Sequence, residues 1–444
     1  MENEWEEITL GQLVKAGGGI IQTGPFGSQL HASDYVDQGI PVIMPVNLID
    51  DRVNISDIAK ISKHDAERLS KHLVQSGDIV YSRRGDVTRK ALIREAEAGM
   101  FCGTGCLLVR PGNHVNSQFL KYHLSTPENQ EWIIRHAIGA TMPNLNTSIL
   151  SKIPLRIPNI KLQDRIAAIL GTLDDKIELN RQINTTLESM AQALFKSWFV
   201  DFDPVIDNAL AAGHPIPEEL QAKAQRRAAL GDQRQPLPAE IQKLFPSSFV
   251  FNEEMGWVPE GWAQAQWRDI AELKYGKSLK GYRDGNGSVP VFGTNGPVGY
   301  TDHALCNHEG IIIGRKGAYR GVKYSATPFF VIDTAFYIEP ILPISMKWAY
   351  YEISRFDINS MDSGSAIPST SRDDFYNLWS VVPSETIHKE FDQLISLLYK
   401  RREINESENA TLSLLRDSLL PKLLSGQLQI PDAEAAVENA LETS

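Results

Sequence analysis

The sequence predicts an α/β (α+β) protein of two globules. Two long antiparallel coiled-coil helices separate two similar domains, and a pseudo-twofold internal repeat relates the halves. The first observation behind this prediction is a pair of long amphipathic segments, residues 158–200 and 383–425. Apolar residues recur along both at alternating steps of about three and four, the spacing of a coiled-coil seam. The second observation is that the residues before each segment follow one plan of strands, turns and loops.

The two halves match in register. Pro143 corresponds to Pro368, and Glu178-Leu179-Asn180 corresponds to Glu403-Ile404-Asn405, with an offset of 225 residues in both cases. A period of about half the chain indicates a duplication, since solenoid repeats are roughly 20–50 residues long. Asn180 and Asn405 interrupt the apolar seam at matching positions. Either they are buried and fix the register of the helices, or they are exposed at an imperfect seam.

Composition limits the class of protein. The 444 residues are enough for two or three domains, and 42% hydrophobic with 22% charged residues is ordinary for a globular protein. The sequence lacks an apolar run long enough to span a membrane, an apolar signal core at its start, and the cysteines of a disulfide framework. These features predict a cytoplasmic protein. The net charge of −11 argues weakly against a nucleic-acid partner, although local basic patches can override it.

Residues 1–157 form the first predicted domain, of mixed α/β type. A glycine-rich loop at 17–30 follows its opening segment, and residues 76–93 read as strand, basic turn and strand, with Gly85-Asp86 supplying the turn. The first long helix covers 158–200. Residues 201–258 are rich in proline and predict a partly ordered connector with one short helical piece near 218–230.

Residues 259–382 repeat the plan of the first domain in shorter form. The segment 275–300 corresponds to the glycine-rich loop and first strand, and 309–325 corresponds to the strand, basic turn and strand. The second long helix covers 383–425. The acidic tail at 426–444 is expected to be frayed.

In its paired motifs and their order, the chain resembles the specificity subunit of a type I restriction-modification system. The resemblance covers nearly the whole chain and rests on paired motifs: GPFGSQL and YGKSLKGY, SGDIVYSRRG and IIIGRKG, MPNLNTSILSKIPLRIP and AIPSTSRDDFYNLWSVVP, and the two long helices. It implies two target-recognition domains that each read one half of a bipartite, asymmetric DNA site. It also implies that the helices set the distance between the half-sites and dock partner subunits.

The partners that the resemblance implies are two methyltransferase subunits and outer restriction (motor-nuclease) subunits. S-adenosylmethionine, ATP and Mg²⁺ would then bind to those partner subunits, with none in this chain. The exposed seam faces, with Trp198, Phe199 and Phe202, predict that the chain aggregates without its methyltransferase partners.

Basic residues gather in the matched loops and turns of the two domains. Arginine can donate two hydrogen bonds to guanine, arginine and lysine neutralise phosphates, and amides can read adenine. A single basic turn is best read as a solvated hairpin tip, whereas two turns at matching places favour DNA contact. The candidate DNA-binding residues are Gln22, Thr23, Ser28, Arg83, Arg84, Arg89, Lys90, Lys277, Ser278, Lys280, Arg283, Asn295, Arg315, Lys316 and Arg320.

The sequence lacks complete motifs for phosphate, dinucleotide or zinc binding. Residues 271–278 end like a phosphate-binding loop but begin with alanine, and Gly17-Gly18-Gly19 lacks dinucleotide-binding spacing. Cys102 and Cys106 with His114 lack a second ligand pair, and so do Cys306 and His308. We therefore expect no catalytic residue, bound cofactor or metal in this chain. The alternatives are a self-contained nuclease or methyltransferase, which activity of the lone chain would reveal, and a coiled-coil scaffold that does not bind DNA.

Overall fold

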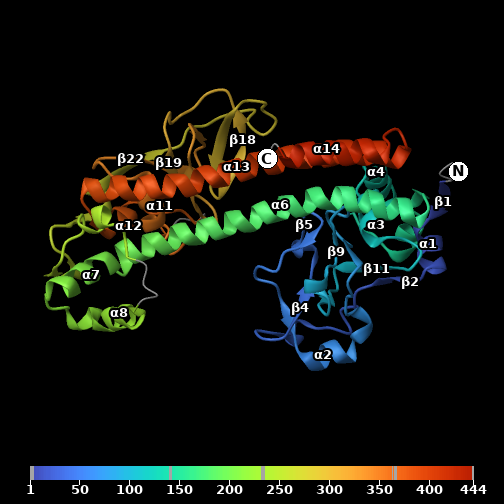
Figure 1. Cartoon of the computed structure of the whole chain (residues 1–444), viewed down its shortest axis with the longest axis horizontal. Coiled ribbons are helices and arrows are strands. Elements are labelled where there is room, and N and C mark those ends of the chain that lie inside the picture. The colour runs from blue at the N-terminus through green and yellow to red at the C-terminus, as the bar shows by residue number, and fades with distance from the viewer. Residues whose placement is uncertain (1–4, 140–142, 232–235, 363, 365–367, 443–444) are drawn as a thin grey trace. The chain divides into compact units, whose positions relative to one another are not determined.

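The computed structural model describes residues 5–139, 143–231, 236–362, 364 and 368–442 (Figure 1). The predicted lead-in segments therefore lie partly outside the described residues, at 140–142 and 365–367. The chain divides into two compact units, the first formed by Met1–Arg181 with Glu406–Ser444 and the second by Gln182–Asn405. Both boundaries fall inside a long helix, so each unit holds part of α6 (Ile160–Phe195) and part of α13 (Glu385–Ser425).

The first unit is a mixed α/β globule that packs on its parts of α6 and α13. Its remaining elements are β1 (Glu6–Thr9), α1 (Leu10–Ala16), β2 (Gly18–Thr23), β3 (Tyr35–Val36), β4 (Ile40–Ile43), β5 (Leu48–Ile49), β6 (Arg52–Val53), β7 (Lys60–Ile61), α2 (Lys63–Arg68), β8 (Ile79–Ser82), β9 (Lys90–Leu92), β10 (Phe101–Cys102), β11 (Cys106–Gly112), α3 (Ser117–Leu124), α4 (Pro127–His136), α5 (Thr147–Ser151), β12 (Pro154–Ile157) and α14 (Ile430–Glu442).

The second unit follows the same plan with an added helical segment at its start. Its elements are α7 (Asp203–Ala212), α8 (Glu218–Ala229), α9 (Ala239–Gln242), β13 (Phe249–Asn252), β14 (Gly256–Pro259), β15 (Ala263–Gln266), α10 (Trp267–Ile270), β16 (Ala271–Tyr275), β17 (Val289–Gly293), β18 (Gly296–Thr301), β19 (Gly310–Gly314), β20 (Val322–Ser325), β21 (Phe330–Val331), β22 (Ala335–Pro340), α11 (Met346–Ile353), α12 (Arg372–Tyr376) and β23 (Trp379–Val382).

A four-stranded sheet of the same topology lies in each unit. Its strand order is β2-β11-β8-β9 in the first unit and β16-β22-β19-β20 in the second. The long strand β11 runs antiparallel to both β2 and β8, and β22 runs antiparallel to both β16 and β19. The internal repeat predicted from sequence is therefore confirmed at the level of strand order and direction.

The two long helices run antiparallel in both units, as predicted. In the first unit Lys176 of α6 pairs with Glu408 of α13 at 3.0 Å, and Asp174, which precedes Lys176, pairs with Arg416, which follows Glu408. In the second unit the Nδ2 of Asn184 lies 3.4 Å from the carbonyl oxygen of Arg402. Apolar seam residues pack with the globule in each unit because a helix with one apolar face is stable only when that face is covered.

Asparagine pairs lie inside the seam. Asn180 and Asn405 are fully buried. Asn180 donates from Nδ2 to Oδ1 of Asn409 at 3.0 Å in the first unit, and Asn405 donates to Oδ1 of Asn184 at 2.7 Å in the second. The 225-residue offset converts one pair into the other. The buried alternative is thus correct, and paired amides disfavour any shift that would set asparagine against an apolar neighbour.

Two sequence expectations for the middle of the chain differ from the structure. The connector contains the short helix predicted near 218–230, which is α8, but it also contains the helix α7 that was not predicted. Trp198, Phe199 and Phe202 are buried in the core of the second unit, where Phe199 and Phe391 pack edge to face at 4.9 Å between ring centroids. They form part of this chain's own core and are not themselves an exposed apolar surface.

The acidic tail also differs from expectation because most of it is the helix α14. Ile430, Ala433 and Val437 repeat at helical spacing and are buried in the core of the first unit. The acidic residues that suggested fraying occupy the other faces of that helix. None of the described helices is both long and apolar enough to cross a membrane.

Candidate nucleic-acid interface

Strand direction brings a loop and a basic turn to one sheet edge in the first unit. Because β2 and β8 are both antiparallel to β11, they run parallel and end at the same edge. The amide of Gly24 donates to the carbonyl of Cys106, and the amide of Arg83 donates to that of Gly105, both at 2.9 Å. The end of β2, with Gln22 and Thr23, therefore lies near the start of the basic turn.

The basic turn between β8 and β9 is fixed by the segment that leads into α6. The amide of Gly85 donates to the carbonyl of Pro143 at 3.2 Å, and the amide of Leu145 donates to the carbonyl of Arg83 at 2.8 Å. Gly85 has a φ of +76°, a left-handed conformation that favours glycine. The backbone that carries Arg84 is thus held from both sides.

The basic turn between β19 and β20 is held in the same way in the second unit. The amide of Gly317 donates to the carbonyl of Pro368 at 2.9 Å, and the amide of Thr370 donates to the carbonyl of Arg315 at 2.8 Å. Pro368 and Thr370 are the residues that the 225-residue offset assigns to Pro143 and Leu145. The duplication therefore extends to individual hydrogen bonds around the two turns.

The loop after β16 meets this second turn. β16 and β19 end at the same edge, because both are antiparallel to β22. The guanidinium of Arg315 stacks over the ring of Tyr275 at 4.8 Å, and the amide of Lys277 donates to the carbonyl of Val331 at 2.9 Å. Thr294 donates from Oγ1 to the carbonyl of Lys316 at 2.7 Å, which brings the adjacent Asn295 to the same edge.

Most of the candidate residues lie at these edges with accessible side chains. The exposed residues are Ser28, Arg84, Arg89, Lys277, Ser278, Lys280, Arg283 and Asn295, and the half-buried ones are Gln22, Thr23, Arg83, Arg315 and Lys316. The Gln22 amide already donates to the carbonyl of Lys71 at 2.6 Å. Arg89 pairs with Asp86 at 3.2 Å.

Two candidates are buried, which corrects the expectation that they face DNA. Lys90 is buried and pairs through Nζ with Asp51 at 2.9 Å. Arg320 is buried and donates from its guanidinium to the carbonyl of Asn359 at 2.7 Å. In both cases the charged group is buried and contacts a residue of its own unit, so it is not accessible to DNA.

The sequence analysis did not single out two exposed aromatic residues in these loops. Tyr319 lies between Lys316 and Arg320 in the second turn and is 82% exposed, and Phe26 is exposed in the glycine-rich loop of the first unit. A large aromatic side chain close to glycines in the loop or turn of each domain is a signal that could have identified both.

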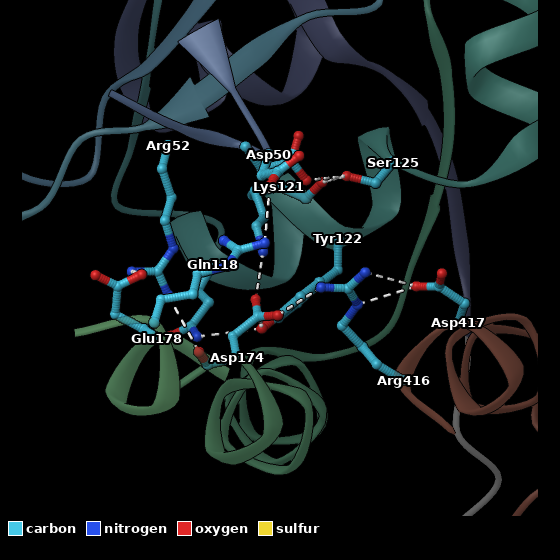
Figure 2. A network of polar contacts seen from close by, with 12 residues as sticks. Asp50, Arg52, Gln118, Lys121, Tyr122, Ser125, Asp174, Glu178, Arg416 and Asp417 are labelled. Carbon is cyan, nitrogen blue, oxygen red and sulfur yellow. Dashed lines mark hydrogen bonds and ion pairs between the residues drawn. The ribbon is translucent and has the colours of Figure 1, made fainter. Parts of the chain in front are cut away.

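A buried polar network attaches the first globule to the helix pair within the first unit (Figure 2). The Asp174 carboxylate on α6 accepts hydrogen bonds from Lys121 Nζ, Tyr122 Oη and the Arg416 guanidinium, each at 2.7 Å. Burial alone would raise the pKa of Asp174, but Lys121, Tyr122 and Arg416 lower it to about 2. The carboxylate is therefore charged at neutral pH and links α3, α6 and α13.

The second unit uses different chemistry at the matching place. Tyr351 of α11 lies 2.9 Å from Tyr399 of α13, hydroxyl to hydroxyl, and also donates to Glu188 of α6 at 3.2 Å. The 225-residue offset assigns Tyr399 to Asp174. Burial and the neighbouring Glu188 raise the pKa of Tyr399, so its hydroxyl stays neutral. Each globule is therefore joined to its helix pair at the matching position, although the side chains that make the contact differ.

Comparisons with known proteins find relatives over most of the chain. The family model described as type I restriction modification DNA specificity domain matches residues 2–189. The chain is 27% identical over 412 residues to the HindI specificity subunit of Haemophilus influenzae, covering 81% of this chain and 88% of that protein. It is 23% identical to the MjaIX specificity subunit of Methanocaldococcus jannaschii, covering 90% and 89%.

A solved structure shares the fold. The S subunit of a type I restriction-modification system from M. genitalium superposes with a TM-score of 0.51 at 17% identity, covering 95% of this chain and 96% of that one. Over residues 2–189 the chain matches the type I restriction modification DNA specificity domain, and over most of its length it is similar to specificity subunits of type I restriction enzymes.

Proposed function

We propose that this chain is the DNA sequence-specificity subunit of a type I restriction-modification complex and that each unit reads one half of a bipartite, asymmetric site. The observation that carries the proposal is the pair of basic turns held by matching backbone hydrogen bonds in the two units. The same pair of backbone hydrogen bonds holds each turn against the segment that leads into the following long helix. The side chains of the two turns differ, with SRRG in one and GRKG in the other, so the two halves of the site would differ as well.

In the proposed complex, side chains on the turns and loops would contact DNA, and the hydrogen-bonded backbone would hold them in position. Exposed Arg84 and Lys277 are suited to phosphate or guanine contacts, and exposed Asn295 is suited to adenine. The aromatic rings of Tyr319 and Phe26 would contact sugars or base edges. A fixed backbone lowers the entropy lost when such side chains meet DNA.

The proposal includes the partners. Two methyltransferase subunits would dock on this chain and bring S-adenosylmethionine, and restriction subunits with ATP and Mg²⁺ would join them. The chain itself would be non-catalytic and would act with its complex in the cytoplasm. This assignment favours recognition over a self-contained nuclease or methyltransferase.

The decisive experiment is genome-wide mapping of methylation. The chain is co-expressed with its cognate methyltransferase subunit in a host that lacks methylation, and modified bases are sequenced. We expect a split motif with two defined halves and an unspecified gap of fixed length. Replacing residues 1–157 with those of a relative should change one half only. A contiguous motif would refute the reading of one half-site by each unit.

A point variant tests the first turn. Arg84→Ala should weaken specific binding on the order of tenfold, as expected for one arginine contact to a base or phosphate. Arg135→Ala is the matched control, because Arg135 is an exposed arginine of the first unit on α4. Equal affinities for the two variants would exclude Arg84 from the interface.

A further inference from the structure

Three metal-binding side chains converge in the second unit. Sγ of Cys306 lies 3.5 Å from Nε2 of His308, which lies 3.6 Å from Oε2 of Glu339. One ligand atom from each residue fits within 4.8 Å of the other two. Cys306 and His308 belong to the segment before β19, and Glu339 belongs to β22. The group therefore joins a loop to the central strand of the sheet.

These separations suit one zinc ion. Zinc bonds to sulfur at about 2.3 Å and to nitrogen or oxygen at about 2.0–2.2 Å, so ligand atoms around a tetrahedral ion lie about 3.3–3.6 Å apart. The Cys306–His308 and His308–Glu339 separations already have about these values. Rotation of the Glu339 carboxylate can close the remaining side of the triangle.

The orientation of His308 supports the same conclusion. Its Nδ1 lies 2.6 Å from the carbonyl oxygen of Glu309, and a carbonyl can only accept, so Nδ1 carries the proton. Cys306 Sγ is 3.5 Å from both ring nitrogens, and the bond to Glu309 decides between them. Nε2 then keeps a free lone pair and lies 3.6 Å from Oε2 of Glu339, as in histidine ligands whose other nitrogen is bonded to a carbonyl. Because Sγ is equidistant from the two nitrogens, it lies off the axis of that lone pair, and the His308 ring must turn for Cys306 to share the ion.

The surrounding charge also favours a cation. Glu339 on β22 is the direct cross-strand partner of Glu272 on β16, and like charges in such a pair are destabilising. Lys274 bonds to Glu272 at 2.6 Å. A divalent ion at Glu339 would remove the remaining repulsion between the two carboxylates.

We propose that Cys306, His308 and Glu339 form a zinc site with a fourth position open to solvent. Cys306 is buried beneath the site, whereas the side chains of His308 and Glu339 are 51% and 35% exposed, which leaves room for a water ligand. Binding replaces the thiol proton of Cys306, which leaves to solvent. The bound ion ties the loop before β19 to β22 in the second unit and does not depend on the proposed DNA function.

Cobalt titration of the full-length chain tests the proposal, because Co²⁺ takes the same ligands and absorbs visible light. After dialysis against a chelator, we expect one Co²⁺ per chain, a sulfur-to-cobalt charge-transfer band and the visible bands of a four-coordinate ion, all removed by Zn²⁺. Cys306→Ser should abolish the sulfur band. His308→Ala and Glu339→Gln should each weaken Co²⁺ binding about tenfold or more.

Controls separate this site from the other cysteines and histidines. Cys102 and Cys106 remain in Cys306→Ser, so a sulfur band that persists there would overturn the proposal. His303→Ala removes an exposed histidine of the same segment and should leave the titration unchanged. Glu339→Gln changes a partly exposed side chain, and circular dichroism would verify its fold. Failure to bind one equivalent of Co²⁺, or full affinity in the His308 and Glu339 variants, would refute the site.

Discussion

Replacing Asp174 with asparagine should loosen the first unit locally. The substitution keeps the size of the side chain but removes the charge that Lys121, Tyr122 and Arg416 share. The Asp174 side chain is only 14% exposed, so water cannot replace these contacts in the folded state. We expect α3 (Ser117–Leu124) to separate from α6 and α13 more often in the variant.

The magnitude follows from the pKa of Asp174 and its partners. Lowering the pKa from 3.8 to about 2 corresponds to roughly 2 kcal/mol of stability, at about 1.4 kcal/mol per pKa unit. Breaking a buried ion pair costs about 3–5 kcal/mol when the remaining charge is left alone. Lys121 still has Asp51 nearby, and Arg416 still has Asp417 at 2.9 Å, so the lower part of the range applies. We expect a loss of about 2–3 kcal/mol.

The same reasoning fixes the pH dependence. The folded-state pKa of Asp174 is below its unfolded value, so the stabilisation is complete above about pH 4 and is lost as the pH falls toward 2. Over that interval the wild-type carboxylate takes up a proton and comes to resemble the neutral amide. The difference in stability between the wild-type chain and Asp174→Asn should therefore shrink as the pH decreases.

Amide hydrogen exchange on the full chain measures the effect where it occurs. Peptides from α3 should exchange faster in Asp174→Asn, whereas peptides from α11 (Met346–Ile353) in the second unit should not change. Asp417→Asn is the matched control, because Asp417 also pairs with Arg416 but is 63% exposed, and exposed pairs contribute about 0–1 kcal/mol. Equal exchange in the two variants would refute the role assigned to Asp174.

Three further variants test other parts of the fold. Ending the chain at Gly426 removes α14 and its buried apolar face, and should lower the free energy of unfolding of the first unit, measured by urea titration, by on the order of 3 kcal/mol. Asn405→Ala leaves Oδ1 of Asn184 without its donor and should cost about 1–3 kcal/mol, and the double variant with Asn184→Ala should cost less than the sum in a double-mutant cycle. Gly85→Ala, at a φ of +76°, should cost about 1–2 kcal/mol in thermal unfolding and weaken specific DNA binding, whereas unchanged values would show that the turn adapts.

Features that depend on short-range periodicity or on self-similarity could be predicted from the sequence. The seam of the long helices, the matched asparagines and the two basic turns are visible because their evidence lies within a few residues or at one constant offset. Ile430, Ala433 and Val437 have helical apolar spacing, which could have predicted α14. The acidic composition of the tail led instead to the expectation of a frayed end.

Features that depend on distant partners could not be predicted. Lys90 and Arg320 look like exposed cations at hairpin turns, but each meets a partner 39 residues away that withdraws it from solvent. Glu339 joins Cys306 and His308 only through the pairing of strands in the sheet. Alternation within one strand gives the face on which a side chain lies, but it does not identify the residue that meets that side chain there.

The repeated hydrogen bonds around the basic turns would allow one scaffold to carry the two different recognition surfaces that the proposed function requires. Leu145 and Thr370 have different side chains, yet the backbone amide of each donates a hydrogen bond to the carbonyl of the arginine in its turn. Pro143 and Pro368 lack an amide proton but retain the carbonyl that each turn uses. Because backbone groups make these contacts, exposed side chains on the turns can change without loss of the frame. Under the proposed function, the sequence that each unit reads could then diverge while the backbone of the turns stays the same.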